Sequence, residues 1–392
     1  MLSVDQARAQ LLNAARPVTE TETLATTDTL GRILAESVVS AVNVPPLDNS
    51  AMDGYAVRLA EAQAEAILPV SQRIPAGTLP QPLAMGSAAR IFTGAPVPEG
   101  ADAIVIQEDT EAADGQVRIL RAAKPAAHIR RAGEDIRAGQ TVLVAGTRLG
   151  PAQLGVAAST GADRLTVYRR LKVAVFFTGD ELVQPGQPLP PGRIYNSNRA
   201  SLIALLTAMG CEVIDLGTVT DTLAATTTAL EQAAREADVV MTTGGVSVGE
   251  EDHVKAAVSQ LGRLDLWKVA MKPGKPLAYG RVGTADFIGL PGNPVSAYVV
   301  FCLFAQPFLL TRMGGRWQPP LNFNLPAGFE RKKAGDRQEY LRARVEQGRA
   351  VLYPNQSSGA LTSMAWAEGL VEVEAGHSIA TGDPVRFIPM VM

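Results

Sequence analysis

Cysteine and histidine are scarce in this chain, whose 392 residues include two cysteines and three histidines. Cys211 and Cys302 stand in apolar surroundings and show no metal-ligand spacing. Two cysteines and three histidines so placed cannot form a zinc cluster of the usual kind, and a disulfide framework is a poor interpretation. His128, His253 and His377 are scattered along the chain, so no catalytic machinery built on serine or cysteine is visible.

The sequence also lacks a strong charge of one sign and a long apolar run. A net charge of -3 gives no basic field for non-specific nucleic-acid binding, so any anion site must be local. The most apolar segment, residues 295–310, contains Gln306 and Pro307 and is interpreted as too short to span a membrane. Asp5 and Arg8 interrupt the first apolar stretch, which argues against a signal peptide. We therefore expect a cytoplasmic enzyme or binding protein with no membrane or nucleic-acid partner.

Helical and β-like patterns alternate in the first part of the chain. Residues 3–16 carry apolar side chains at helical spacing, and residues 29–40 are interpreted as another helix or helix end. Short β-branched runs cut by turns fill residues 66–145, and helical character returns at 151–160. We expect a split N-terminal helical and linker domain (residues 1–43 and 137–168) around a β-rich insertion domain (residues 44–136).

Predicted strands and helices alternate between residues 169 and 315. The run 171–177 is typical of a buried strand, Asn198 is expected to cap the next helix, and Pro307 is expected to kink or break the last one. Such βαβ units predict a largely parallel sheet with helices on both faces. Residues 316–392 are short alternating runs after a linker, which predict a small β-barrel or sandwich.

Several loops rich in Gly, Pro and Asp follow the predicted strands. They are TGDEL (178–182), TVTDT (218–222), TTGGVSVGEED (242–252) and LPGNP (290–294), with KPGKP (272–276) expected to join them. In parallel sheets ligands bind at the carboxyl ends of the strands, so these loops should gather at one edge. Gly244 and Gly245 permit a tight turn before a helix, which aims backbone N–H groups at an anion. Taken alone, a Gly-Gly pair is also ordinary turn chemistry.

Lysines and acids accompany these loops. If residues 265–272 form one strand, Lys268 and Lys272 share a face about 13 Å apart, and with Lys275 they suit a polyanion with more than one phosphate. A solvated basic face is the alternative. The absence of GxxxxGK[ST] argues against a P-loop nucleotidase.

The acids Asp180, Glu181, Asp221 and Asp252 come from three predicted strand ends. Carboxylates beside phosphates fit a shared Mg²⁺ or an oriented water, although each acid alone could also cap a helix. Three further polar residues, Asp53, Thr93 and Asp135, lie in elaborate loops of the β-rich insertion. A purely structural role for these loops stays open.

Together these stretches resemble the molybdopterin molybdenumtransferase family, called MoeA in bacteria and the gephyrin E-domain in animals. The matching segments are PPLDNSAMDGYA (45–56), IFTGAPVPEGADAIV (91–105), RRAGEDI (130–136), FTGDEL (177–182), TTGGVSVGEED (242–252), KPGKP (272–276) and LPGNPVSA (290–297). They span nearly the whole chain in the family's order, and the C-terminal region matches least. His253 stands where relatives often carry an aromatic residue, which bears only on local packing.

The resemblance implies a fold and an activity. It implies a split N-terminal helical domain, a β-rich insertion, a doubly wound, mostly parallel α/β domain (169–315) similar to the adenylyltransferase MogA, and a C-terminal β-barrel (316–392). It also implies elongated homodimers, with the cleft between the central domain of one subunit and the insertion of the other. The implied reaction inserts molybdenum from molybdate into adenylylated molybdopterin and releases AMP, with Mg²⁺ assisting.

The resemblance also implies residue roles. Gly244, Gly245 and Ser247 would cradle the phosphate linkage, and Lys268, Lys272 and Lys275 would bind pyrophosphate or molybdate. Glu181, Asp221 and Asp252 would hold the metal or orient a water, with Asp53, Thr93 and Asp135 acting from the opposite wall. Pro291 and Pro294 would shape the LPGNP loop, and Arg342 and Ser358 are added from the last domain.

Two other interpretations stay open. One is the adenylyltransferase of the same pathway, which shares the central domain but normally lacks the flanking β-rich modules. The other is a scaffold that binds a partner protein through the dimer and the last domain, a role that does not need convergent acids and lysines.

For a molybdenumtransferase, the expected partners are the adenylyltransferase and the enzymes that accept the finished cofactor.

Overall fold

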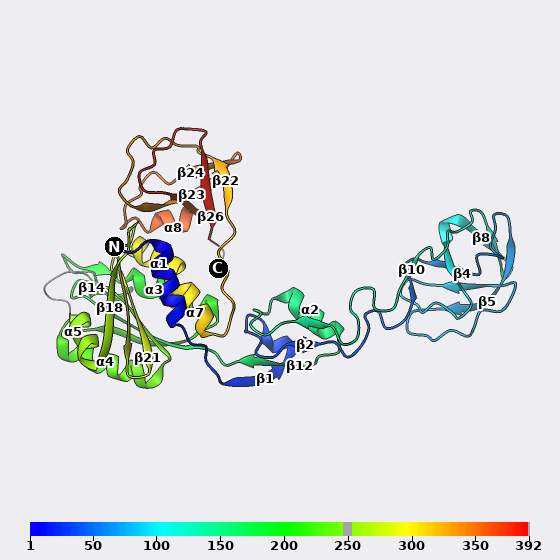
Figure 1. Ribbon diagram of the computed structural model, residues 1–392, viewed down its shortest axis with the longest axis horizontal. Helices are drawn as coiled ribbons and strands as arrows, with labels where there is room; N and C mark the ends of the chain where they lie inside the picture. The colour runs from blue at the N-terminus through cyan, green and yellow to red at the C-terminus, as the bar shows by residue number, and fades with distance from the viewer. Residues whose placement is uncertain (246–252, 391–392) are drawn as a thin grey trace.

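The computed structural model describes residues 1–245 and 253–390. The molecule is elongated (Figure 1). The central α/β sheet and the C-terminal strands form one end, a β-rich lobe forms the other, and a small module around helix α2 (Pro151–Ser159) lies between them. Both chain termini lie at the α/β end.

A six-stranded sheet forms the centre of the α/β end. Its order is β16 (Glu212–Val219), β13 (Lys172–Thr178), β17 (Val239–Thr243), β21 (Ala285–Leu290), β20 (Pro276–Val282) and β18 (Gly262–Lys268). The first four strands are parallel, β20 runs antiparallel to both of its neighbours, and β18 again runs in the direction of the first four, so the prediction of a mostly parallel sheet is confirmed.

Successive side chains of β13 bury on opposite faces of this sheet. Phe177 joins the core under α3 (Ser197–Met209) and the last long helix, whereas Phe176 joins the core under α4 (Leu223–Glu236) and α5 (His253–Leu261). The strand is therefore apolar without interruption, as expected of a strand covered on both faces.

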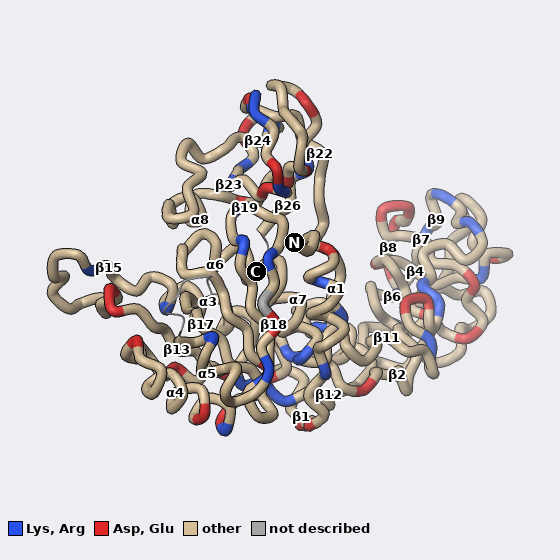
Figure 2. Tube along the Cα trace, turned by 60° about the vertical axis from the view of Figure 1, so that its left-hand side comes forward, with Lys and Arg blue, Asp and Glu red and all other residues tan. Residues whose placement is uncertain are grey.

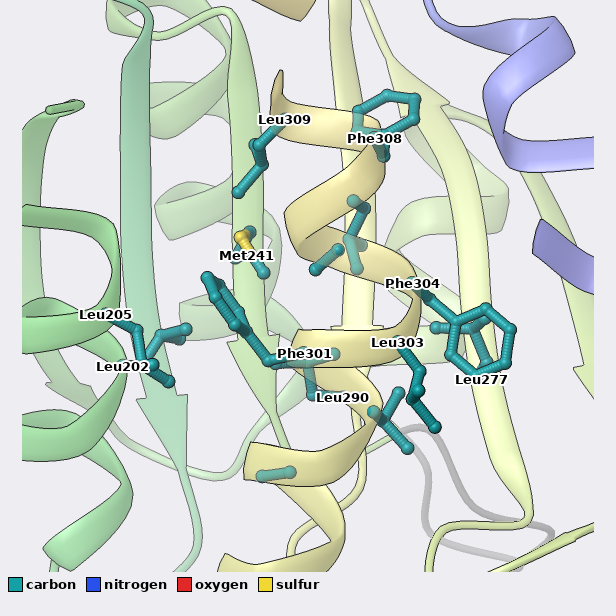
Figure 3. Close-up of a cluster of buried hydrophobic side chains, with 14 of the residues drawn as sticks. Leu202, Leu205, Met241, Leu277, Leu290, Phe301, Leu303, Phe304, Phe308 and Leu309 are labelled. Carbon is teal, nitrogen blue, oxygen red and sulfur yellow. The ribbon is translucent and has the colours of Figure 1, made fainter. Parts of the chain in front are cut away.

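The last long helix runs from Pro294 to Arg312 as α6 (Pro294–Val300), a π-helical turn (Phe301–Ala305) and α7 (Gln306–Arg312). Pro307 lacks an N–H group, and the predicted kink takes the form of this widened turn just before it. The helix has 19 residues and is long and apolar enough to cross a membrane by length and composition, so the expectation that it is too short was wrong. However, 67% of its most apolar window is buried, and Phe301 and Phe304 pack into the core (Figure 3).

Helix α1 (Val4–Ala14) packs on α7, and the N-terminal segment then crosses to the middle module. This module pairs β1 (Thr21–Ala25) with β12 (Arg164–Tyr168) and β2 (Val38–Val39) with β11 (Thr141–Leu143). The predicted helix at 29–40 is wrong, because this described segment is mostly extended: Leu34 bridges Val167, and a 3₁₀ turn (Thr26–Thr29) precedes it. Pairing with a segment over a hundred residues away overrides local helical propensity here.

The β-rich lobe is a six-stranded sheet, and the chain enters and leaves it through the short pair β3 (Asn49–Ser50) and β10 (Ile129–Arg130). The order is β7 (Ala103–Ile106), β4 (Gly54–Val57), β6 (Ala88–Ile91), β5 (Ile67–Ile74), β9 (Gln116–Ile119) and β8 (Thr110–Ala113). Alternate side chains of β4 bury in separate clusters, Tyr55 in one and Ala56 in the other, so this lobe has its own core.

The C-terminal region forms a third six-stranded sheet and packs beside α1 at the α/β end (Figure 1). The order is β19 (Met271–Lys272), β23 (Gln338–Glu346), β25 (Gly369–Val373), β26 (Pro384–Pro389) and β22 (Phe323–Pro326), with β24 (Arg349–Leu352) on β23. A bridge between Ala327 and Ala350 brings the chain after β22 back to β24. Strand β19 comes from the central region, so the central and C-terminal regions of the chain share this sheet.

Candidate functional site

The loops at the carboxyl ends of the central parallel strands contact one another. The Thr178 hydroxyl at the end of β13 donates to Asp221 Oδ1 (2.8 Å), which lies in the loop after β16. The Gly244 N–H after β17 donates to the Leu290 carbonyl at the end of β21 (3.0 Å). Four loops therefore meet at one edge of the sheet, as the alternation of strands and helices predicts.

Glycine is required where the chain turns after β17. Gly244 and Gly245 have φ values of +88° and +63°, in the left-handed region that favours glycine. A Cβ on Gly245 would lie 2.4 Å from Val254 Cγ2 of α5, so the turn has no room for a side chain. Backbone N–H groups can approach a ligand closely at such a turn. Ser247 and Asp252, which follow in the predicted site, lie outside the described residues.

Two predicted metal ligands lie at the end of β13. Asp221 is held there by Thr178, and a Cβ on the neighbouring Gly179 would lie 2.7 Å from Glu181 Oε2, so the Glu181 carboxylate folds back over that glycine. Two hard oxygen donors fit Mg²⁺, which commonly takes one or two carboxylates together with substrate phosphates. Among the described residues no group of three His, Cys, Asp or Glu could hold a metal by itself. The third predicted ligand, Asp252, is outside that set.

The condition that residues 265–272 form one strand is not met. Strand β18 ends at Lys268, Val269 then bridges Leu2, and β19 pairs with β23 of the C-terminal sheet. Lys268 and Lys272 therefore belong to different sheets instead of sharing one strand face. The change of sheet depends on partners at the two ends of the chain, which local patterning does not reveal.

The lysine-rich turn nevertheless reaches the same edge as the other loops. Lys268 pairs with Pro276, whose strand runs antiparallel to β21 and starts level with the end of that strand. A Cβ on Gly274 would lie 2.4 Å from Val300 Cγ2 and 3.5 Å from the Ser296 carbonyl, so the KPGKP turn packs on α6. Helix α6 begins directly after the LPGNP loop, with Pro294 at its first position.

The C-terminal region reaches the start of α6. The Ser358 carbonyl accepts a hydrogen bond from the Val295 N–H (3.0 Å), which places Ser358 beside the LPGNP loop and Pro291. Arg342 is 1% exposed, and its guanidinium donates to Ser363 Oγ (3.1 Å) and to the Ser357 carbonyl (3.2 Å). Burial lowers the pKa of Arg342 to about 10. As placed, Arg342 holds the loop that carries Ser358, and its guanidinium is enclosed by protein.

Asn198 makes contacts that the sequence interpretation missed. The predicted cap is wrong by two residues, since Asn196 Oδ1 accepts from the Arg199 N–H (3.0 Å) and caps α3. The Asn198 amide instead donates to the Gly292 carbonyl (2.7 Å) and to Thr243 Oγ1 (3.2 Å). The sequence did contain a signal for this contact, the NSN triplet at 196–198. One asparagine is enough to cap the helix, so the second needs another explanation.

The predicted residues of the β-rich lobe are ordered but distant. The Thr93 N–H and hydroxyl both donate to Asp53 Oδ1 (2.8 Å each), and the hydrogen bond from the Thr93 N–H, followed by that from its hydroxyl, lowers the pKa of Asp53. Asp135 lines an open cavity of about 480 Å³ with Val44, Pro45, Asn49, Arg130 and Glu134, where the chain enters and leaves the lobe. Figures 1 and 2 both show the lobe well separated from the central sheet. A single chain therefore does not bring these residues to Glu181 and Asp221.

Comparisons with known proteins agree along the whole chain. Family models match the MoeA N-terminal region (domains I and II) over residues 2–161, a probable molybdopterin-binding domain over 174–311, and the MoeA C-terminal region (domain IV) over 324–390. The molybdopterin molybdenumtransferase of Haemophilus influenzae is 41% identical and covers 99% of this chain and 98% of its own length. The chain belongs to the MoeA family.

Further relatives support this membership. Molybdopterin molybdenumtransferase 2 of Mycobacterium tuberculosis is 39% identical and covers 96% of this chain and 97% of its own length. A crystal structure of the molybdopterin biosynthesis MoeA protein of Pyrococcus horikoshii superposes with a TM-score of 0.85 at 26% identity, covering 99% of this chain and 100% of that one. The N-terminal MoeA model spans α1, the middle module and the β-rich lobe in one match, so the lobe is a regular part of the family's chain.

Proposed function

We propose that this MoeA-family chain is a molybdopterin molybdenumtransferase, which inserts molybdenum from molybdate into adenylylated molybdopterin and releases AMP. The full-length similarity to proteins of that name supports the assignment. The observation that carries it is the meeting of the glycine turn, the carboxylate loops and the lysine turn at one edge of the central sheet. This edge offers backbone N–H groups, ammonium groups and carboxylates to a substrate that carries phosphates.

We assign different roles to the residues of this edge. The Gly244–Gly245 turn brings the Gly245 N–H to the phosphate linkage, while the Gly244 N–H stays bonded to the Leu290 carbonyl. Lys268, Lys272 and Lys275 neutralise the charge of the linkage and that of molybdate. In the reaction a phosphorus–oxygen bond of the adenylate linkage breaks, water supplies the new oxygen on phosphorus, and AMP leaves. The two dithiolene thiols bind molybdenum through their sulfurs, and one molybdate oxygen leaves as water with the two thiol protons. The chain contributes position and charge to these exchanges.

Mg²⁺ fits the donor chemistry of the carboxylate loops. When bound, it neutralises phosphate charge and polarises a phosphoryl oxygen. We assign Glu181, Asp221 and Asp252 to hold it. Thr178 keeps the Asp221 carboxylate at the end of β13 and leaves the second carboxylate oxygen available.

We assign the opposite wall of the cleft to a second copy of the chain in a homodimer. The β-rich lobe, which carries Asp53 and Thr93 and has Asp135 where the chain leaves it, lies at the far end of the molecule from the central sheet (Figure 1). A second subunit can bring its lobe to the central edge. Pro291 and Pro294 shape the LPGNP loop, and Arg342 supports Ser358 beside it. We also propose four domains with the boundaries expected from the sequence and a cytoplasmic location. The adenylyltransferase of the pathway would deliver the substrate, and the cofactor-accepting enzymes would take the product.

Purified protein tests the assignment directly. Adenylylated molybdopterin, molybdate and Mg²⁺ should yield AMP and a product that activates a cofactor-free molybdenum enzyme. Lys272→Ala and Asp252→Ala should lower that rate strongly, while Lys333→Ala on the exposed surface of the C-terminal region should not. Full activity in both site variants would refute the role assignment. ATP consumption with molybdopterin alone would indicate an adenylyltransferase instead.

A further inference from the structure

Asn198 lies in the first turn of α3 and reaches across the carboxyl edge of the sheet. Its Nδ2 donates to the Gly292 carbonyl in the middle of the LPGNP loop and to Thr243 Oγ1 at the end of β17. Thr243 directly precedes Gly244, so one amide group connects the base of the glycine turn to the neighbouring loop. No role in binding or catalysis has been given to this residue above.

The bridge lies where the backbone pairing of the two strands stops. The parallel ladder between β17 and β21 ends with Thr243 opposite Leu290, and the Gly244 N–H still donates to the Leu290 carbonyl. Beyond this point the two loops touch, since a Cβ on Gly292 would lie 3.6 Å from Gly244 Cα. The side chain of Asn198 thus continues the connection past the last rung of the ladder.

Helix α3 gives Asn198 a firm base. Independently of the cap, the Arg199 guanidinium donates to Asp215 Oδ2 of β16 (2.9 Å) and to Gln184 Oε1 (2.6 Å) in the segment after β14 (Leu182–Val183). The helix start is therefore tied to two other elements of the same edge. A donor fixed in this way can set the distance between two loops, because its own backbone is held independently of them.

We propose that Asn198 is a positioning residue, which holds the Gly244–Gly245 turn and the LPGNP loop at the spacing that the phosphate linkage needs. The inference rests on the proposed function, because the reaction defines what is positioned. Asn198 acts through Thr243 and Gly292 and need not touch substrate. The two N–H donors of the Asn198 amide matter more than its shape. An aspartate side chain has the same size, but its carboxylate carries only acceptor oxygens and cannot donate to the Gly292 carbonyl.

Two variants and one matched control test the proposal. Asn198→Ala removes the bridge, and Asn198→Asp keeps the shape but cannot donate. Asn196→Ala removes the cap of the same helix and leaves both bonds of Asn198 in place. We expect both Asn198 variants to lower kcat for AMP release about 10- to 100-fold, as misplaced reacting groups do. The cap variant should lower the melting temperature at least as much and change kcat little.

Amide hydrogen exchange provides a readout that does not need the reaction. Exchange at residues 243–245 and 290–293 should accelerate in both Asn198 variants, and in Asn196→Ala it should accelerate only within α3. Unchanged exchange at these two loops, or an equal loss of kcat in the cap variant, would overturn the proposal. A parent protein that releases no AMP would refute the proposed function alone, and the exchange comparison would then decide whether the bridge holds the two loops.

Discussion

The central edge and the β-rich lobe each contain an aspartate held by a threonine, and the two pairs are built differently. In the central domain, as far as the described residues show, Asp221 in the loop after β16 accepts one hydrogen bond, from the hydroxyl of Thr178 at the end of β13. In the lobe Thr93 holds Asp53 with both its N–H and its hydroxyl. The central carboxylate therefore depends on loops folding together, whereas the lobe presents its carboxylate already fixed. A carboxylate that is already fixed within the lobe of one subunit can complete the proposed cleft of another subunit.

The comparison predicts complementation between two inactive proteins. Asp221→Ala and Asp53→Ala should each lose activity by about 100-fold or more if each carboxylate is needed at a shared site. Mixed and refolded together, or co-expressed, they should recover roughly a quarter of the parent's activity, because half of a random mixture is heterodimer with one intact cleft. AMP release measures the recovery.

The control for complementation pairs two changes from the same wall. Asp221→Ala with Glu181→Ala should recover nothing, because the central domain of every cleft then lacks one of the two carboxylates. If Asp221→Ala and Asp53→Ala also recover nothing, the walls do not come from different subunits. Sedimentation of the mixture should show a dimer, and a monomeric protein with full activity would contradict the arrangement.

The backbone of the central edge should tolerate side chains poorly. Gly245→Ala adds a Cβ at φ +63° and 2.4 Å from Val254 Cγ2, so we expect a loss of about 2–4 kcal/mol in unfolding free energy from strain and overpacking together, with at least a tenfold loss of activity. Gly217→Ala is the matched control, since its φ is +72° but no atom lies within 4 Å of the added Cβ. Chemical denaturation measures both. Equal losses of unfolding free energy in the two variants would mean that backbone strain alone, and not contact with Val254, causes the destabilisation.

The sequence predicted the central edge better than the contacts within it. Uninterrupted apolar runs such as that of β13 reveal a parallel sheet, and the position of loops after such strands places Glu181, Asp221 and Gly244 at one edge. Local patterns carry this information because strand burial and glycine turns are local properties. The pairing of Thr178 with Asp221 was not predicted, since it depends on how two loops pack.

The failures have the same physical origin. Residues 29–40 were predicted to be helical, but Leu34 pairs with Val167. The expected spacing of Lys268 and Lys272 assumed one strand over residues 265–272, but β19 leaves the central sheet to pair with β23. In each case the partner lies far away in the sequence, and its contribution outweighs local propensity. The sequence identified Asp53 and Thr93 as polar loop residues, but the hydrogen bonds between them could not be predicted.

Thr178→Val tests the weaker of the two threonine–aspartate pairs. Valine keeps the volume and removes the hydroxyl, so Asp221 loses the hydrogen bond that holds it at the end of β13. We expect kcat to fall about tenfold, which corresponds to the loss of one hydrogen bond of roughly 1.4 kcal/mol in the transition state. Steady-state AMP release checks this. Unchanged kcat would show that Asp221 is held by other contacts or does not act in the reaction.

Thr93→Val is the matched change in the lobe and should have the smallest effect. The N–H of residue 93 still donates to Asp53, so the carboxylate stays in place and kcat at neutral pH should fall about twofold or less. The lowered pKa of Asp53 arises first from that N–H and then from the hydroxyl, so the variant should raise it only part of the way to its ordinary value. If the Asp53 carboxylate acts in the reaction as proposed, activity is lost as pH falls through this pKa, and the loss should begin at a higher pH in Thr93→Val than in the parent. Carbon NMR of the labelled Asp53 carboxyl and the acid limb of the rate profile should shift together. A loss at neutral pH as large as that of Thr178→Val would show that the N–H does not hold Asp53 and that the two walls are built alike.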